Sequence, residues 1–369
     1  METPASSSFS DASLNPVEPS VGRVGIEVVP FRDLLNDADA DGGRSVTAYR
    51  SHTQRATTGL GQLTVPLALA VPYDARFRQR VALDRNWRMG RHVRHCLLGH
   101  ADNVYCIQFA GDVLVSGSRD QTVAFWDLRS MTQVRALTGH AGSVLCLQFN
   151  AHYLVTGSSD HTVGIWDLKG NRLRTLRGHQ SPVLDVRMDM TIVVSCSKDN
   201  TVRVWDIETG ALRRSLVGHT AAVNAVWLHG DRCVSASGDC TLKLWEVHTG
   251  VCVREFIGHQ NGLACVQYDG RIIVSGSNDK TLRVWNAETG ALLHILEGHT
   301  SLVRTLCFDS ERIVSGSYDH SIKVWDLRTG ALLQDFVNAH RLSVFQVMMD
   351  KTRIVSAGQD RAIVVWDFA

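Results

Sequence analysis

The sequence predicts an all-β protein, a seven-bladed β-propeller, from three observations. A histidine recurs about every 40 residues, an aspartate follows each histidine after twenty residues, and a tryptophan follows each aspartate after six. Seven copies keep this spacing without an internal slip. A period of about 40 residues is typical of a four-stranded propeller blade. The repeated residues are His100, Asp120 and Trp126; His140, Asp160 and Trp166; His179, Asp199 and Trp205; His219, Asp239 and Trp245; His259, Asp279 and Trp285; His299, Asp319 and Trp325; His340, Asp360 and Trp366.

Each copy contains the sequence patterns of β-strands. In the first copy, residues 104–109 alternate, residues 113–118 form a run of buried type, and residues 122–126 alternate again. Thr-Gly pairs such as 289–290 supply the glycine that a tight turn favours. The interval from tryptophan to the next histidine varies between 13 and 15 residues, whereas the His-to-Asp interval is constant. We therefore expect insertions in the connection between the third and fourth strands.

Three segments are predicted along the chain. Residues 1–72 are rich in Ser, Gly and Asp and show no sustained period, which is typical of a mostly disordered region. Residues 73–92 form a linker, in which Tyr73, Phe77 and Val81 step by four and predict a short amphipathic helix. Residues 93–369 form the propeller. Because the chain ends directly after a third strand, residues 92–98 are predicted to supply the missing fourth strand beside residues 363–366.

Composition excludes several classes of protein. The 369 residues carry a formal net charge of +1, which disfavours a general nucleic-acid binder. The longest apolar run, residues 65–71, is too short to cross a membrane, and no secretion signal precedes it. Nine cysteines include no C-x-x-C pair, so reduced thiols and a cytoplasmic or nuclear location are expected. No metal or cofactor is predicted.

The repeated polar residues allow two interpretations. Each copy has a Ser or Thr four residues before its Asp, so a Ser-His-Asp triad is one interpretation. A buried hydrogen-bond chain from indole to hydroxyl, imidazole and carboxylate is the other. An enzyme needs one nucleophile rather than seven equivalent ones, so we predict a structural network and no enzymatic activity. The hydroxyl residues are Ser116, Thr156, Ser195, Ser235, Ser275, Ser315 and Ser356.

The copies resemble WD repeats. Gly-His opens six of them, and Trp-Asp closes five. A second resemblance concerns the linker: residues 86–92, Asn-Trp-Arg-Met-Gly-Arg-His, are similar to the junction before the propeller in F-box/WD-repeat proteins, whose members include the beta-TrCP and Cdc4-like branches. Residues 73–85 are similar to the linker helix of that family, and residues 104–109 to the first propeller strand of the beta-TrCP branch. The resemblance implies a non-enzymatic substrate adaptor of an SCF/cullin-type ubiquitin ligase.

The N-terminal region departs from this family. An F-box, which binds Skp1, should precede the linker helix, but only residues 29–35 are similar to the start of one. The following Asp, Gly, Ser and Thr residues, with Pro66 and Pro72, do not predict compact helices. A decayed F-box, a truncated or alternatively assembled chain, and a different role are the alternatives. Skp1 or cullin binding therefore does not follow from the sequence, and a general WD scaffold in signalling, trafficking or complex assembly is the second function.

The resemblance also implies where a partner binds. In such propellers two variable residues per blade face the central channel, one placed five residues after the His and one immediately before the Asp. Aromatic residues and arginines at these positions concentrate in copies six, seven and one, which closure of the ring makes adjacent. We expect an acidic or singly phosphorylated peptide there, bound by guanidinium groups. The alternative is that large residues only cap the channel and a partner binds the rim. The predicted partner-binding residues are Arg304, Tyr318, Phe345, Gln359, Tyr105, Arg119 and Lys198.

This assignment also predicts how charge reversal acts. Replacing Arg304 and Arg119 with Glu should abolish capture of the partner without lowering the melting temperature.

Overall fold

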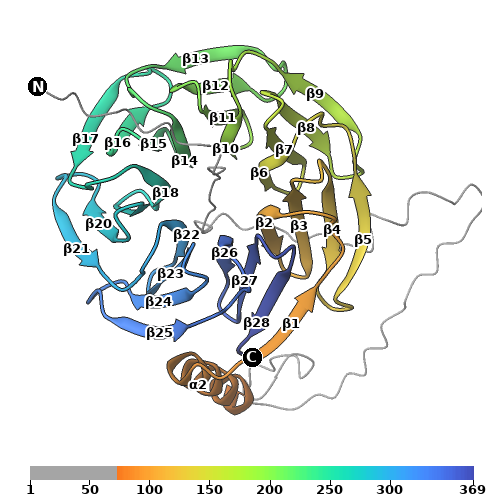
Figure 1. Cartoon of the computed structure of the whole chain (residues 1–369), viewed down its shortest axis with the longest axis vertical. Helices are drawn as coiled ribbons and strands as arrows, with labels where there is room; N and C mark the ends of the chain where they lie inside the picture. Colours follow the sequence, from red (N-terminus) through yellow and green to blue (C-terminus); the bar gives the residue numbers. More distant parts are fainter. Residues whose placement is uncertain (1–72) are drawn as a thin grey trace, which may run out of the picture.

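Seven four-stranded antiparallel sheets surround a central axis in a computed structural model that describes residues 73–369 (Figure 1). In each sheet the first strand lies at the axis and the fourth at the periphery. The seven-bladed propeller predicted from the repeat is therefore confirmed. The prediction of disorder in residues 1–72 falls outside the described residues.

The strands follow the blades in order, and blade seven takes its fourth strand from the beginning of the propeller. The elements are β2 (Val104–Ala110), β3 (Val113–Ser118), β4 (Val123–Asp127) and β5 (Thr132–Leu137) in blade one; β6 (Val144–Phe149), β7 (Tyr153–Ser158), β8 (Val163–Asp167) and β9 (Arg172–Leu176) in blade two; β10 (Val183–Met188), β11 (Ile192–Ser197), β12 (Val202–Asp206) and β13 (Leu212–Leu216) in blade three; β14 (Val223–His229), β15 (Arg232–Ser237), β16 (Thr241–Glu246) and β17 (Cys252–Ile257) in blade four; β18 (Leu263–Tyr268), β19 (Ile272–Ser277), β20 (Leu282–Asn286) and β21 (Leu292–Leu296) in blade five; β22 (Val303–Phe308), β23 (Arg312–Ser317), β24 (Ile322–Asp326) and β25 (Leu332–Phe336) in blade six; and β26 (Val344–Met349), β27 (Arg353–Gly358), β28 (Ile363–Asp367) and β1 (Val93–Leu97) in blade seven.

Burial explains the two kinds of strand sequence. The first two strands of a blade are covered by neighbouring blades on both faces, so β10 and β11 are buried along their whole length. The fourth strands lie at the periphery, and four of the five residues of β13 are exposed. Apolar runs therefore mark inner strands, and mixed polar sequences mark the outer edge.

The ring closes by pairing the two ends of the propeller. Strand β1 is antiparallel to β28, with Val93 opposite Asp367 and Leu97 opposite Ile363. This confirms the predicted fourth strand of blade seven. Closure removes the open edge that β28 would otherwise present to other chains.

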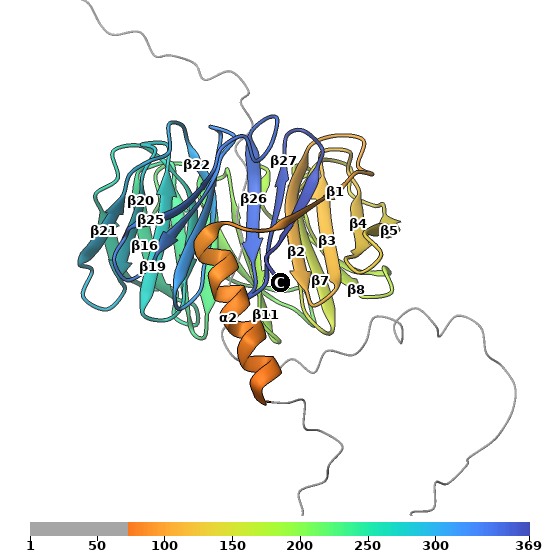
Figure 2. The ribbon, with the colours of Figure 1, turned by 90° about the horizontal axis from the view of Figure 1, so that it is seen from below.

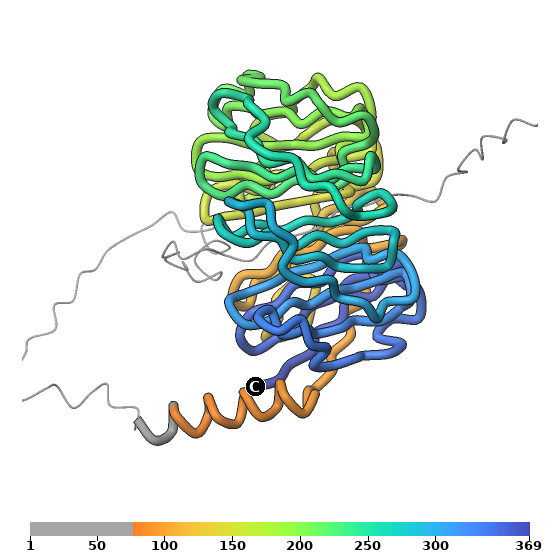
Figure 3. Tube along the Cα trace, turned by 90° about the vertical axis from the view of Figure 1, so that its left-hand side faces the viewer, coloured from red at the N-terminus to blue at the C-terminus, as the bar shows by residue number. Residues whose placement is uncertain are grey.

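A helix, α2 (Tyr73–Met89), precedes β1, as the linker pattern predicts, and lies outside the ring beside the C-terminus (Figures 2 and 3). Its outward side carries Phe77 and Val81, which are 61% and 51% exposed, whereas Trp87 is 3% exposed against the propeller. Phe77 and Val81 therefore do not lie on the side that contacts the blades. Among residues 73–369 no helix has the length and apolar character needed to cross a membrane.

The Trp-to-His interval is one residue shorter than usual in blade two and one residue longer in blade six, and the two differences fall in different connections. In blade two the connection between β8 and β9 is one residue shorter than its counterpart, since Trp166 pairs with Arg172 whereas Trp205 pairs with Leu212. In blade six this connection has the usual length, and the extra residue lies between Phe336 and His340. The prediction that all insertions fall between third and fourth strands is therefore wrong for blade six.

Candidate functional site

The repeated polar residues form one hydrogen-bond chain in each blade. In blade one the Trp126 indole donates to Ser116 Oγ at 2.8 Å, Ser116 Oγ lies 2.8 Å from His100 Nε2, and His100 Nδ1 lies 2.9 Å from Asp120 Oδ2. The other six blades repeat the indole contact at 2.8–3.0 Å. Because the hydroxyl accepts from the indole, its own hydrogen is available to Nε2, which leaves the imidazole proton on Nδ1 facing the carboxylate.

This chain ties together the loops on one face of the propeller. Asp120 Oδ2 also accepts from the Ala101 backbone N–H at 2.9 Å, and Oδ1 accepts from the Thr122 backbone at 3.0 Å. Burial acts to raise the pKa of Asp120, but hydrogen bonds from His100 and Thr122 lower it well below its usual range. We call the face that carries these loops the His–Asp face. The seven hydroxyl groups belong to fully buried residues, so the chain of hydrogen bonds holds these loops in place from the interior.

The seven residues placed five after each repeat histidine form an inner ring. Each sits at a register shift between the first two strands of its blade, for example Tyr105 between Val104 and Cys106. A bulge of this kind re-aims a side chain. All seven are buried: Tyr105, Leu145, Leu184, Asn224, Ala264, Arg304 and Phe345.

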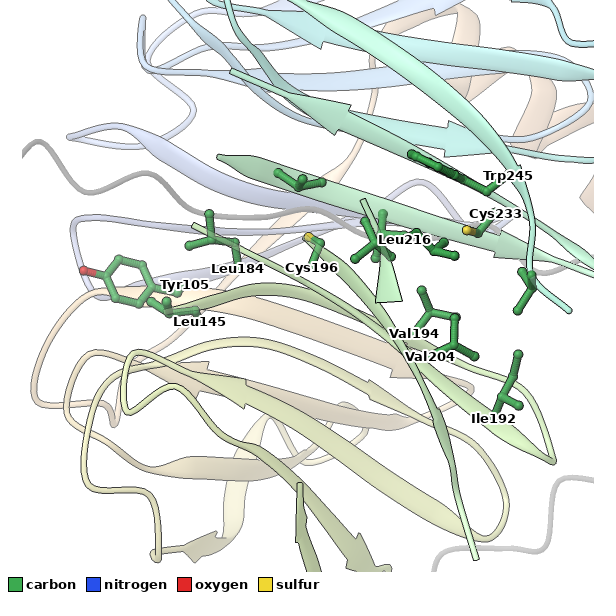
Figure 4. Packing of buried hydrophobic residues seen from close by; sticks show 14 of the residues in the cluster. Tyr105, Leu145, Leu184, Ile192, Val194, Cys196, Val204, Leu216, Cys233 and Trp245 are labelled. Atoms are coloured by element: carbon green, nitrogen blue, oxygen red, sulfur yellow. The ribbon is translucent and has the colours of Figure 1, made fainter. Parts of the chain in front are cut away.

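Aromatic rings of the inner ring pack against each other and against Tyr318, which immediately precedes Asp319. The centroids of Tyr105 and Phe345 lie 5.3 Å apart, and Tyr318 lies 6.0 Å from Phe345. Leu145 and Leu184 belong to the same buried cluster, and Figure 4 shows them beside Tyr105. These side chains from blades six, seven, one, two and three therefore form a plug in the channel rather than an open surface.

Arg304 belongs to the inner ring, as the sequence analysis expects, but its side chain is fully buried there. Its relative exposure is 0%, and burial lowers the pKa of its guanidinium, with Tyr318 among the groups that act in the opposite sense. A fully buried side chain does not present its charge to a peptide on the surface. Tyr105 and Phe345 are also buried, with 3% exposure, which is the arrangement expected for large residues that cap the channel. Their predicted partner-binding role remains untested.

The seven residues immediately before each repeat aspartate form a rim ring. Here Arg119, Lys198 and Gln359 are exposed, and Tyr318 is half-buried over the plug. The side chain of Arg119 is 58% exposed, and its Nε lies 3.7 Å from Asp102. An exposed pair at this distance contributes little to stability. The guanidinium of Arg119 is thus placed where a partner can reach it.

Two further exposed arginines lie on blade seven. Arg341 follows His340, and its backbone N–H donates to Asp360 Oδ2 at 2.9 Å. Arg361 follows Asp360 and has a φ of 63°. The sequence analysis missed both because it considered only two positions per repeat. A signal was present, since the residues directly after the other repeat histidines are Ala, Gln or Thr.

Comparison with known proteins identifies the repeat. The model of the family "WD domain, G-beta repeat" matches residues 91–127, 131–167, 170–206, 210–246, 250–286 and 290–326. This chain belongs to the WD40 repeat family. The crystal structure of the computationally designed Ika8 protein is similar to 73% of this WD40 chain at 38% identity, with a TM-score of 0.63, and 85% of Ika8 is covered.

Two curated relatives match part of the chain, one named as an F-box/WD repeat protein and one as an SCF subunit. The F-box/WD repeat-containing protein pof1 of Schizosaccharomyces pombe is 38% identical over 66 residues, which is 18% of this chain and 11% of pof1. The probable E3 ubiquitin ligase complex SCF subunit sconB of Talaromyces stipitatus is 29% identical over 100 residues, 27% of this chain and 14% of sconB. The matched part of this WD40 chain thus spans about an eighth of these relatives.

The interior of the WD40 propeller also holds a charged pair that the sequence analysis missed. Asp185 Oδ1 accepts from Arg187 Nη1 at 2.7 Å, and Asp185 Oδ2 accepts from the Val226 backbone of the next blade at 3.0 Å. Burial raises the pKa of Asp185 to about 7, although Arg187 acts in the opposite sense. The signal for this pair in the sequence was the Asp-x-Arg pattern of residues 185–187, which lies within the inner strand β10. Within residues 73–369, no group of three His, Cys, Asp or Glu side chains is placed to hold a metal ion.

Proposed function

We propose that this WD40 protein is the substrate-recognition subunit of an SCF/cullin-type ubiquitin ligase. The chain is a propeller of an interaction family, and pof1 and sconB, which it resembles in part, are named as F-box/WD and SCF proteins. The residues 86–92 that resemble the F-box/WD junction lie where α2 meets the propeller. In this proposal α2 connects the ligase-binding part to the substrate-binding part.

The exposed arginines of blades seven and one carry the proposal for the substrate. Arg341, Arg361 and Arg119 lie on neighbouring blades of the His–Asp face and are exposed. Guanidinium groups bind carboxylate and phosphate groups through paired, charge-assisted hydrogen bonds. We therefore infer an acidic or singly phosphorylated peptide as substrate, with Arg119, Arg341 and Arg361 as anion-binding residues. Tyr318 and Gln359 are inferred to contact the peptide beside them.

A peptide array tests the substrate class. The full chain is applied to immobilised peptides that contain aspartate, glutamate or one phosphoserine, with unmodified serine peptides as reference. Arg119→Glu combined with Arg341→Glu and Arg361→Glu should abolish binding of the anionic peptides. Lys280→Glu is the matched control, because Lys280 occupies on blade five the position that Arg361 has on blade seven. Equal loss in the control, or unchanged binding by the triple variant, would overturn the assignment.

Capture of Skp1 and cullin by the full chain tests the ligase assignment separately. Under the proposal both proteins are retained by the wild type and by the triple arginine variant. The second candidate, a general WD40 scaffold without a ligase role, is favoured by one observation: the family match covers WD40 repeats only. Peptide binding without capture of Skp1 or cullin would establish that candidate instead.

A further inference from the structure

The outer strands of neighbouring blades are joined by a repeated side-chain contact. Arg214 Nε donates to the His248 carbonyl at 3.1 Å, Arg254 Nη2 to the Glu288 carbonyl at 2.8 Å, and His294 Nε2 to the Arg328 carbonyl at 3.0 Å. In each case the side chain comes from a fourth strand. The carbonyl belongs to the turn between the third and fourth strands of the next blade.

A glycine follows two residues after each accepting carbonyl. Gly250, Gly290 and Gly330 have φ values of 78°, 79° and 73°, a conformation that favours glycine. A Cβ on Gly330 would lie 3.3 Å from His294, and one on Gly290 would lie 3.1 Å from Arg254. The donor side chain therefore both bonds to the turn and packs against its glycine.

Blade seven takes its fourth strand, β1, from the N-terminal side of the propeller, so no turn runs directly from its third strand, β28, to its fourth. The fourth strand of blade six nevertheless makes the same contact. Gln334 Nε2 donates to the Arg88 carbonyl at 2.6 Å. Two residues later, Gly90 has a φ of 63°, and a Cβ there would lie 2.6 Å from Gln334 Oε1. Residues 88–90 thus repeat the order of acceptor, spacer and left-handed glycine.

The segment before this turn is attached to the C-terminal end of the chain. Asn86 Nδ2 donates to the Phe368 carbonyl at 2.9 Å, and the Trp87 indole donates to the Lys351 carbonyl at 2.9 Å. The rings of Trp87 and Phe368 stack with centroids 4.0 Å apart and an interplanar angle of 10°. The guanidinium of Arg312 lies 4.7 Å from the centroid of Trp87. Contacts to blades six and seven therefore hold both sides of the indole.

We propose that residues 86–90 are the outer turn of blade seven, supplied from the N-terminal side, and that they form a latch with β1. The ring is then closed twice, by the β1–β28 ladder and by the contacts of Trp87, Arg88 and Gly90. In consequence, α2 does not swing independently of the propeller: release of α2 and opening of blade seven are one event. The N-terminal half of α2 projects beyond the face opposite the His–Asp face (Figure 2). The latch therefore fixes the position of α2 relative to the His–Asp face.

Amide hydrogen exchange of the full chain tests the latch. Trp87→Ala should raise exchange at least tenfold in residues 85–97 and in β28 together, while β14, β15 and β16 on the far side of the ring remain unchanged. Faster exchange confined to α2 would overturn the proposal, because the helix would then open independently of blade seven. An equal rise in all seven blades would overturn it as well, because no separate unit would open.

If Trp87→Ala does not fold, two milder variants still test the latch. Gln334→Ala removes the contact to residues 88–90, and His294→Ala removes the equivalent contact between blades five and six. Gln334→Ala should raise exchange in β1 and in residues 88–90, whereas His294→Ala should act only on residues 327–330. The same exchange pattern in both variants, or no change in β1 with Gln334→Ala, contradicts the latch.

Discussion

The inner ring and the rim ring each recur once per repeat, but their exposure to solvent differs. Both have one residue per blade on the His–Asp face, and both include an arginine and an aromatic residue from blades six, seven and one. The inner ring is buried throughout, because each member sits at a bulge that turns it toward the axis. The rim ring leaves Arg119, Lys198 and Gln359 exposed. Two positions of one repeat thus differ in accessibility, since the inner ring packs in the interior while members of the rim ring reach solvent.

The largest expected effect concerns the arginine of the inner ring. Arg304→Glu would bury a carboxylate in the same interior as Asp185, so the free energy of unfolding should fall by about 3 kcal/mol or more. Urea denaturation of the full chain measures this, with Arg119→Glu as the rim control. An unchanged midpoint for Arg304→Glu would show that this side chain reaches solvent. The expectation that charge reversal at Arg304 leaves stability intact is replaced by this one.

A smaller effect is expected from the hydrogen-bond chain within each blade. Ser235→Ala leaves the Trp245 indole and His219 Nε2 without their shared hydroxyl partner. The free energy of unfolding should fall by about 1–3 kcal/mol, the cost of buried unpaired polar groups. Ser130→Ala, at an exposed serine, is the control. If both variants unfold at the same denaturant concentration, the chain does not stabilise the blade.

The interior charge predicts a pH dependence. The pKa of Asp185 is about 7 in the folded state, above its unfolded value, so the folded protein binds this proton more tightly and becomes more stable as pH falls below about 7. Between about pH 7.5 and pH 6, wild type should gain about 1 kcal/mol relative to Asp185→Asn. Thermal unfolding of both proteins across this range measures the difference. Parallel curves would show that Asp185 keeps its ordinary pKa.

The opposite dependence is expected at lower pH for the aspartates of the His–Asp face. Hydrogen bonds lower the pKa of Asp239, so its contribution is present above the unfolded pKa and is lost as pH falls through the folded value. The Asp185→Asn variant should retain this acid transition, which separates the two groups.

The smallest effect on stability is expected at the rim. Arg361→Glu changes an exposed side chain and should alter the free energy of unfolding by no more than about 0.5 kcal/mol. The peptide array should nevertheless register it as weaker binding of anionic peptides. A large loss of stability would show that the Arg361 side chain is buried, like the side chains of the inner ring.

Much of the fold could be predicted because the spacing of the repeated residues depends on local geometry. The His, Asp and Trp spacing sets the length of each hairpin, and a polar chain that must be satisfied in the interior keeps the register. Strand β1 could be predicted because residues 92–98 stand in the fourth-strand position before the first repeat histidine, and the structure pairs them with β28. The burial of the inner ring could not be predicted, since it depends on how side chains from several blades pack together in the channel.

The sequence by itself determined the number of blades, the hydrogen-bond chain in each and the closure of the ring, since all three depend on spacing along the chain. Only the tertiary structure decided which channel residues are accessible, because seven first strands converge on one axis and leave no room between Tyr105 and Phe345. It also decided that Phe77 and Val81 point outward while Trp87 packs inward. A helical period reveals an apolar side but not what covers it, and here the contacts of Trp87 with Phe368 and Lys351 set the orientation.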